Sequence, residues 1–434
     1  MNLTRREMLR ELLMAGLSVT AASAVLAGCG SNAATPTTDA GSAAPASGTA
    51  SSSGPIKLGF IPLTDCASLV VADQMGMFKK HGVDVTVVKM VNWNAVRDQI
   101  SGNQLQGAHC LFGMPFAVET GVSAVKGDPL KIAMTISNNG QGTSLANEFE
   151  GKVKYADFEG LGAAVKSMNK PLTFGMTFPG GTHDMWMHLS LAGAGIDPKS
   201  VAIKPVPPPQ MVNNMKTGGL DGYNVGEPWN GRAVAEKVGF SFIASQDLWQ
   251  NHPEKALVVN GKFAESRRDD LKKVMMAMLE ASQYIDEMKN RPEVAKTIGT
   301  KAYVGAEPEV ILPRLMGDYP LGGGLGMHKT DHPMQFYRGG EVNFPRHGHA
   351  IWFMTAYDRW GKAKLPADPV KVAQNVILQD LYKEVADEMK IAVPDDDMKP
   401  FEVKVDKMTF DPAKPTEMAK MLMAQDTAMQ KKMA

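Results

Sequence analysis

The chain has 434 residues, 46 basic and 46 acidic side chains, and 44% hydrophobic residues. The balanced charge lacks the basic surplus of a nucleic-acid-binding surface, so we expect no nucleic-acid partner. Beyond Leu26, no apolar run approaches the ~18 residues that a membrane-spanning helix needs.

The first residues predict export. Arg5 and Arg6 lie in a string that resembles the twin-arginine export signal, and Leu12 to Gly28 carry no charge. This stretch ends in Leu-Ala-Gly-Cys, which resembles the bacterial lipoprotein box, with Cys29 as the acylated first residue of the mature chain. The sequence therefore predicts a signal peptide over 1–28 and lipid anchoring on the periplasmic side of the cell membrane, with the twin-arginine pathway as the export route.

A tether and a large body follow. Residues 30–54 contain one charged residue, Asp39, and consist almost wholly of Ser, Ala, Thr, Gly and Pro, so they cannot form a core. We interpret residues 29–54 as the lipidated cysteine and a flexible tether. Residues 55–434 are too many for one ordinary core and favour two lobes.

Strand and helix patterns alternate through the body. The sequence predicts a strand over 56–61, a helix from Ala67 to His81 closed by Gly82, and a second strand over 83–88. Further strands are expected near 131–137, 172–177 and 201–205, with a helix over about 183–194. Such alternation predicts an α/β protein with mostly parallel sheets flanked by helices, which bind ligands beyond the carboxyl ends of their strands.

The two body cysteines, Cys66 and Cys110, are interpreted as buried thiols, although their pairing remains open because the compartment permits disulfides. The Lys- and Met-rich C-terminus after Pro415 favours a packing helix over a loose tail.

Distinctive short strings fall at the predicted strand ends. They are Gly59–Asp65, Asn139–Gln141, Phe178–Asp184, Pro207–Val212, Gly226–Asn230 and His252–Lys255, with Gly340–Phe344 and Ile351–Phe353 further along. Together they resemble the nitrate/nitrite-binding lipoproteins of cyanobacterial-type nitrate transporters, whose close relatives bind bicarbonate.

The resemblance implies a two-lobed periplasmic-binding-protein clamp of type II. Lobe I would comprise 55–150 and 256–400, lobe II 151–255, and a C-terminal helix or tail 401–434. The anion would lie between the lobes and pass to the permease and ATPase subunits of an importer. We expect a monomer without cofactor or metal.

The resemblance also implies the ligands. By motif, nitrate would be bound by Trp93, Gln141, His183 and Lys255, with Pro208 and Val225 as walls of the cleft. Independently, nitrate accepts hydrogen bonds and donates none, so its site must supply donors such as these, with Lys255 balancing its charge. The bicarbonate-binding relative has an acidic residue at the Lys255 position and uses a metal ion, so Lys255 favours nitrate or nitrite.

Other functions remain as alternatives. A bicarbonate- or small sulfonate-binding protein would share this fold, and so would a cytoplasmic nitrate sensor, although the export signal disfavours the sensor. A metal-dependent enzyme is disfavoured because His183 and His188, like His347 and His349, lack the i, i+4 spacing of a helical zinc site. Asp184 and Glu227 are interpreted as capping and hinge groups.

Overall fold

The computed structural model describes residues 54–433. The predictions for Arg5, Arg6 and Cys29, the signal peptide over 1–28 and nearly all of the tether lie outside the described residues.

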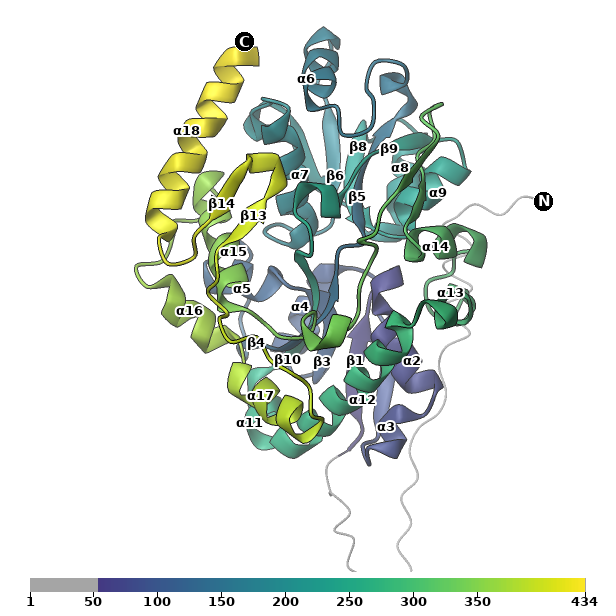
Figure 1. Cartoon of the computed structure of the whole chain (residues 1–434), viewed down its shortest axis with the longest axis vertical. Helices are drawn as coiled ribbons and strands as arrows, with labels where there is room; N and C mark the ends of the chain where they lie inside the picture. Colours follow the sequence, from purple (N-terminus) through teal and green to yellow (C-terminus); the bar gives the residue numbers. More distant parts are fainter. Residues whose placement is uncertain (1–53, 434) are drawn as a thin grey trace, which may run out of the picture. The chain divides into compact units, whose positions relative to one another are not determined.

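Two five-stranded sheets form the centre of the described chain (Figure 1). The first has the order β2-β1-β3-β10-β4, formed by β1 (Ile56–Phe60), β2 (Val85–Lys89), β3 (Gly107–Leu111), β4 (Leu130–Asn138) and β10 (Pro253–Asn260). The second has the order β7-β6-β8-β5-β9, formed by β5 (Gln141–Ala146), β6 (Thr173–Met176), β7 (Ala202–Pro205), β8 (Gly222–Gly226) and β9 (Gly239–Ala244). In each sheet one strand opposes the rest, β10 in the first and β5 in the second. The predicted α/β class with two mostly parallel sheets is confirmed.

Helices fill the connections between the strands. The α-helices up to β10 are α2 (Ala67–Gln74), α3 (Met77–Lys80), α4 (Trp93–Ser101), α5 (Met114–Glu119), α6 (Phe158–Ser167), α7 (Thr182–Gly193), α8 (Met211–Lys216), α9 (Trp229–Ala235) and α10 (Ser245–Leu248). Those after β10 are α11 (Gly261–Ser266), α12 (Arg268–Asp286), α13 (Arg291–Gly299), α14 (Pro308–Leu315), α15 (His347–Arg359), α16 (Pro369–Val376), α17 (Gln379–Glu388) and α18 (Pro415–Met433).

Short elements complete the described chain. The 3₁₀ turns are η1 (Thr64–Cys66), η2 (Asn147–Phe149), η3 (Pro198–Ser200), η4 (Pro208–Gln210), η5 (Met288–Asn290), η6 (Arg338–Gly340) and η7 (Lys404–Asp406). Two antiparallel hairpins pair β11 (Asp318–Pro320) with β12 (Met327–Lys329) and β13 (Phe401–Val403) with β14 (Met408–Phe410).

The prediction of one continuous helix from Ala67 to His81 is wrong. The structure has α2 and α3 instead, because Gly76 adopts a left-handed conformation with φ of 69° between them. This conformation costs glycine little and ends the first helix before the second begins.

The chain crosses between the sheets at two places close together. It passes from β4 to β5 through Asn139 and Gly140, with φ of 62° and 82°, and it returns from β9 to β10 through α10. At this φ any side chain on residue 140 would be strained and would also crowd Met334, so this turn favours glycine. The first crossover therefore places Gln141 at the beginning of β5, beside the segment that leads from β9 through α10 to β10.

The C-terminal helix α18 packs on α15 and α7, with Met418, Ala419 and Leu422 buried (Figure 1). Within residues 54–433, Cys66 and Cys110 are free and buried, as interpreted from the sequence, and the thiol of Cys110 points to Met114 Sδ at 3.3 Å. Over residues 54–433, no helix combines the length and the apolar character needed to cross a membrane.

Candidate functional site

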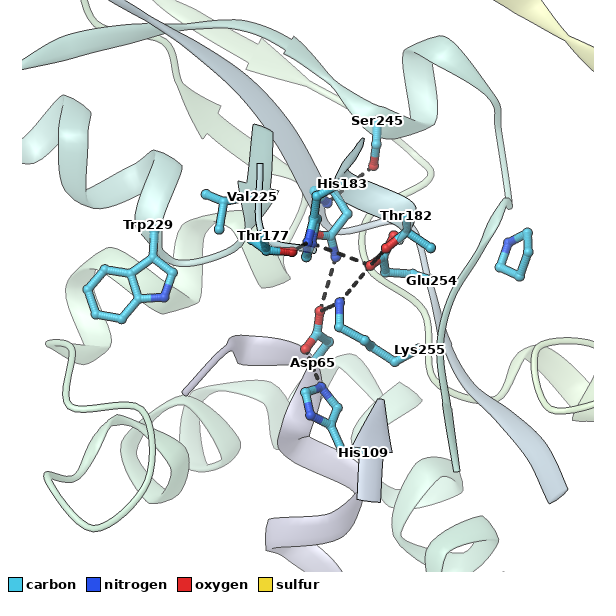
Figure 2. A network of polar contacts seen from close by, with 12 residues as sticks. Asp65, His109, Thr177, Thr182, His183, Val225, Trp229, Ser245, Glu254 and Lys255 are labelled. Atoms are coloured by element: carbon cyan, nitrogen blue, oxygen red, sulfur yellow. Dashed lines mark hydrogen bonds and ion pairs between the residues drawn. The ribbon is translucent and has the colours of Figure 1, made fainter. Parts of the chain in front are cut away.

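A cluster of buried polar side chains lies where the two sheets meet (Figure 2). The first sheet supplies Asp65 from η1 after β1, His109 from β3, and Glu254 and Lys255 from β10. The second supplies Gln141 and the first turn of α7. Apart from His109 in the middle of β3, these positions are strand ends and a helix beginning, where an α/β fold gathers ligand-binding groups.

Lys255 lies at the centre of the cluster. Its ammonium is fully buried and donates to Asp65 Oδ2 at 2.7 Å and to Glu254 Oε1 at 2.6 Å. Burial alone would lower the pKa of Lys255, but the two carboxylates reverse this effect and raise it. Lys255 is therefore charged in the folded protein.

Asp65 joins the two sheets through one oxygen. Its Oδ2 accepts from Lys255 and also from Gln141 Nε2 at 3.0 Å, while Oδ1 lies 2.6 Å from His109 Nε2. Burial would raise the pKa of this carboxyl, yet the Lys255 charge and the His109 contact hold it well below its usual range. Asp65 is therefore an ionised carboxylate shared by a lysine, an amide and an imidazole.

Gln141 and His183 are in direct contact. His183 Nε2 lies 2.5 Å from Gln141 Oε1, and Thr177 Oγ1 lies 2.5 Å from His183 Nδ1. With Nε2 as the donor, the Thr177 hydroxyl donates to Nδ1 and both ring nitrogens are satisfied. Burial and the nearby Lys255 charge lower the pKa of His183 well below its usual value, so the ring is neutral.

Glu254 is held mainly from α7. Thr182 Oγ1 donates to Oε1 at 2.6 Å and the indole of Trp186 donates to Oε2 at 3.0 Å. Burial raises the pKa of Glu254, against the opposing charge of Lys255. This carboxylate therefore ties β10 to the helix that carries His183.

Successive side chains of a regular strand point to opposite faces, yet Glu254 and Lys255 meet in one cluster. The pairing of β10 with β4 is irregular here, with register shifts between Pro253 and Lys255 and between Lys255 and Ala256. A β-bulge of this kind redirects a side chain and is common next to functional sites.

Trp93 begins α4, capped by Asn92, and is 1% exposed. Its ring centroid lies 5.9 Å from Lys255 Nζ and 5.7 Å from the His109 ring. Its indole nitrogen is buried and has no hydrogen-bond partner among residues 54–433. An unpaired buried donor is costly, so this N–H is a group that a bound acceptor would satisfy.

The structure thus brings Trp93, Gln141, His183 and Lys255 into one buried neighbourhood. Val225 lies in β8, paired with Gly142, while the adjacent Gly226 pairs with Gln141. Pro208 is the buried first residue of η4. The ligand roles of all six residues stay predictions.

Sequence reasoning missed Asp65, His109 and Glu254 as members of the site. Asp65 ends the first distinctive string and Glu254 directly precedes Lys255, so the motifs contained both, but a site expected to supply only donors gave no reason to choose carboxylates. His109 lies in no motif and carried no signal.

Contacts beyond the cluster also join the sheets. Thr64 N donates to Glu227 O at 2.7 Å, and the Trp229 indole donates to Pro62 O at 2.9 Å. The Glu227 carboxylate pairs with Arg314 at 2.9 Å. Glu227 therefore supports this junction, and its role as a hinge group stays a prediction.

Asp184 accepts from Gly180 N at 2.8 Å and pairs with Lys362 at 2.9 Å, which is the capping role expected of it. Among the described residues, no group of three or more His, Cys, Asp or Glu side chains is arranged to hold a metal ion.

The fold has a solved counterpart. The crystal structure of the periplasmic nitrate-binding protein NrtA from Synechocystis PCC 6803 superposes with a TM-score of 0.81 at 31% identity, covering 85% of this chain and 98% of that one. With its two sheets and double crossover, the chain has the periplasmic-binding-protein fold.

Sequence comparison defines the family. The model of the NMT1-like family matches residues 49–299. The nitrate/nitrite binding protein NrtA of Nostoc sp. is 35% identical over 429 residues, covering 94% of this chain and 96% of the relative. The bicarbonate-binding protein CmpA of Synechococcus elongatus is 29% identical, covering 83% and 84%. The chain belongs to the NMT1-like family and is a homologue of the nitrate/nitrite-binding proteins, with the bicarbonate-binding protein as a more distant relative.

Proposed function

We propose that the protein is an extracytoplasmic solute-binding lipoprotein of an ABC importer that captures nitrate, and also nitrite, between its two lobes. It would be anchored through Cys29, deliver the anion to the membrane permease and its ATPase, and act as a monomer without catalytic activity. The homology to NrtA proteins supports nitrate and nitrite as the substrates. The similarity to the periplasmic nitrate-binding protein of Synechocystis supports a location outside the cytoplasm.

One observation carries the proposal. Donors from both sheets, Gln141 and His183 on one side and Lys255 and Trp93 on the other, converge in one buried cluster. A small anion that bonds to both sides favours the closed arrangement over an open one, because only closure lets all contacts form together.

Bicarbonate is the second candidate, and a specific observation favours it. Bicarbonate has a hydroxyl that needs an acceptor, and Asp65 and Glu254 place carboxylate oxygens beside Lys255. Sulfonates are less suited, because their alkyl groups need apolar space and this cluster is filled by polar groups bonded to one another.

Calorimetric titration of the full chain in mild detergent with nitrate, nitrite and bicarbonate, the last with and without calcium, tests the proposal. We expect nitrate binding that calcium does not affect, and its loss in Lys255→Met by about 2 to 5 kcal/mol because a desolvated charge partner is removed. The exposed Lys79→Met is the matched control and should bind as the unmodified protein does. Calcium-dependent binding of bicarbonate alone would establish the second candidate instead.

A further inference from the structure

The positive charge of Lys255 is already neutralised before an anion arrives. Its buried ammonium already contacts two carboxylates, Asp65 at 2.7 Å and Glu254 at 2.6 Å. The neighbouring rings of His109 and His183 have lowered pKa values because of burial and add no positive charge. A third anion would meet the negative charge of Asp65, and that of Glu254 whenever it is ionised, where neither water nor salt screens the repulsion.

One oxygen of Asp65 accepts hydrogen bonds from groups that we assign to nitrate. Asp65 Oδ2 accepts from Lys255 Nζ at 2.7 Å (Figure 2) and from Gln141 Nε2 at 3.0 Å, which are two of the four donors that we assign to nitrate. A carboxylate also resembles nitrate chemically, because both present two oxygens of a planar, delocalised anion to their donors.

Of the two carboxylates, Asp65 is the one that an anion can displace from Lys255. Glu254 is held by Thr182 at 2.6 Å and by Trp186 at 3.0 Å in addition to Lys255. Within the part of the chain that the structure describes, Asp65 has only His109 besides the two shared donors, and that contact uses its other oxygen. It can keep His109 while Oδ2 leaves Lys255 and Gln141.

We propose that Asp65 is an internal competitor for the anion, whose carboxylate binds Lys255 and Gln141 in the empty site and is displaced from both when the anion binds. This inference rests on the proposed function and deepens it. Because Asp65 and Gln141 belong to different sheets, the same contact stabilises the closed arrangement without ligand. Asp65 therefore weakens anion affinity, since every binding event must first break its contacts.

The test compares nitrate affinity in the full chain with that of Asp65→Asn, which removes the charge and keeps the shape. We expect the dissociation constant to fall at least tenfold. Asp98→Asn is the matched control, because it removes an exposed carboxylate that pairs only with Arg97 on α4, and it should leave the affinity unchanged. Thermal melting confirms that each variant is folded.

A second arm uses Asp65→Ala with formate, a free carboxylate small enough for the vacated position. Formate should compete with nitrate in this variant and have little effect on the unmodified protein. Equal or weaker nitrate binding by folded Asp65→Asn would overturn the inference while leaving the proposed function intact. Absence of nitrate binding in the unmodified protein would overturn the proposed function itself.

A third measurement needs no variant. In crystals of the unmodified protein grown with nitrate, the distance from Asp65 Oδ2 to Lys255 Nζ should exceed about 4 Å, the limit of an ion pair. Nitrate bound beside an intact contact between these atoms would contradict displacement, even if the variants fail to fold.

Discussion

At the scale of single residues, Trp93 shows how a ligand role can be separated from a packing role. Its side chain is buried, as a core tryptophan would be, but its indole N–H has no partner in the described part of the chain. Burial of an unsatisfied donor lowers stability, so this N–H supports the ligand role predicted for Trp93, which a substitution can test.

We expect Trp93→Phe to weaken nitrate binding by about 1.5 to 3 kcal/mol, the contribution of a hydrogen bond to a charged group. The free energy of unfolding should change little, because the loss of volume is offset by removal of the unpaired donor. Titration calorimetry and urea unfolding measure the two effects.

Trp229→Phe is the contrasting variant for this prediction. Its indole donates to Pro62 O at 2.9 Å, so its replacement should cost about 0.5 to 1.5 kcal/mol of stability. A Trp93→Phe protein that loses stability but keeps its nitrate affinity would show that Trp93 is a packing residue only.

Of the candidate site, the sequence predicts the donors and misses the acceptors. Gln141, His183 and Lys255 were identified by motif, and their side chains do meet at Asp65 or through one another. Asp65 and Glu254 could not be predicted from the needs of an anion, because their role concerns the charge of Lys255 in the empty site. That role is visible only from the distances between these side chains in the structure.

At the scale of elements, local sequence patterns predict helices and strands well. The prediction fails where a single residue changes the backbone conformation. The α2 to α3 region has an apolar pattern that runs through Gly76, so the pattern predicts one helix and the left-handed glycine makes two. By contrast, Pro415 and the following near-helical spacing of apolar residues do coincide with α18.

The docking of α18 depends on a buried ionic junction. Arg359 of α15 donates to both oxygens of Asp406 at 3.0 and 2.8 Å, and to both oxygens of Asp426 of α18 at 2.9 and 2.7 Å. The two carboxylates raise the pKa of Arg359 in spite of its burial. The arginine therefore holds η7 and α18 against α15.

We expect Arg359→Met to lower the free energy of unfolding by about 3 to 5 kcal/mol, because two carboxylates remain without their buried partner. Arg232→Met, which removes an exposed i, i+4 pair with Glu236, should cost no more than about 0.5 kcal/mol. Urea unfolding of both variants checks the difference. Equal effects would mean that α18 is held by its apolar contacts alone.

At the scale of the whole molecule, the two-sheet arrangement was predictable because strand and helix signals alternate and the chain is too long for one core. The assignment of later segments to a lobe was not predictable. Residues 256–400 were assigned to lobe I, yet Arg314 of α14 pairs with Glu227 beside the second sheet. Such contacts are set by tertiary packing and leave no local pattern, so the predicted lobe boundaries stay predictions.

Buried neutral histidines make the stability of the whole molecule depend on pH. Burial lowers the pKa of His252 to about 3, while an unfolded histidine titrates near 6.5. Between these values the unfolded chain binds the extra proton, so the stability from this group is complete above pH 6.5 and is lost as the pH falls.

His252→Gln should therefore flatten the decline of stability on acidification by about 1.4 kcal/mol per pH unit below pH 6. Urea unfolding of both proteins at pH 7, 6 and 5 measures the slopes. Parallel curves would show that His252 does not contribute this proton linkage.

The irregular pairing of β10 has a consequence for how proteins of this kind are compared. Glu254 and Lys255 share one site because two register shifts flank Lys255. A chain with the same four letters, His-Pro-Glu-Lys, on a regularly paired strand would direct its lysine and glutamate to opposite faces of the sheet. Whether a related chain keeps the role of the lysine therefore depends on the register of the strand as much as on the sequence of the motif. A one-residue deletion nearby would change that register and abolish the site while leaving the motif intact.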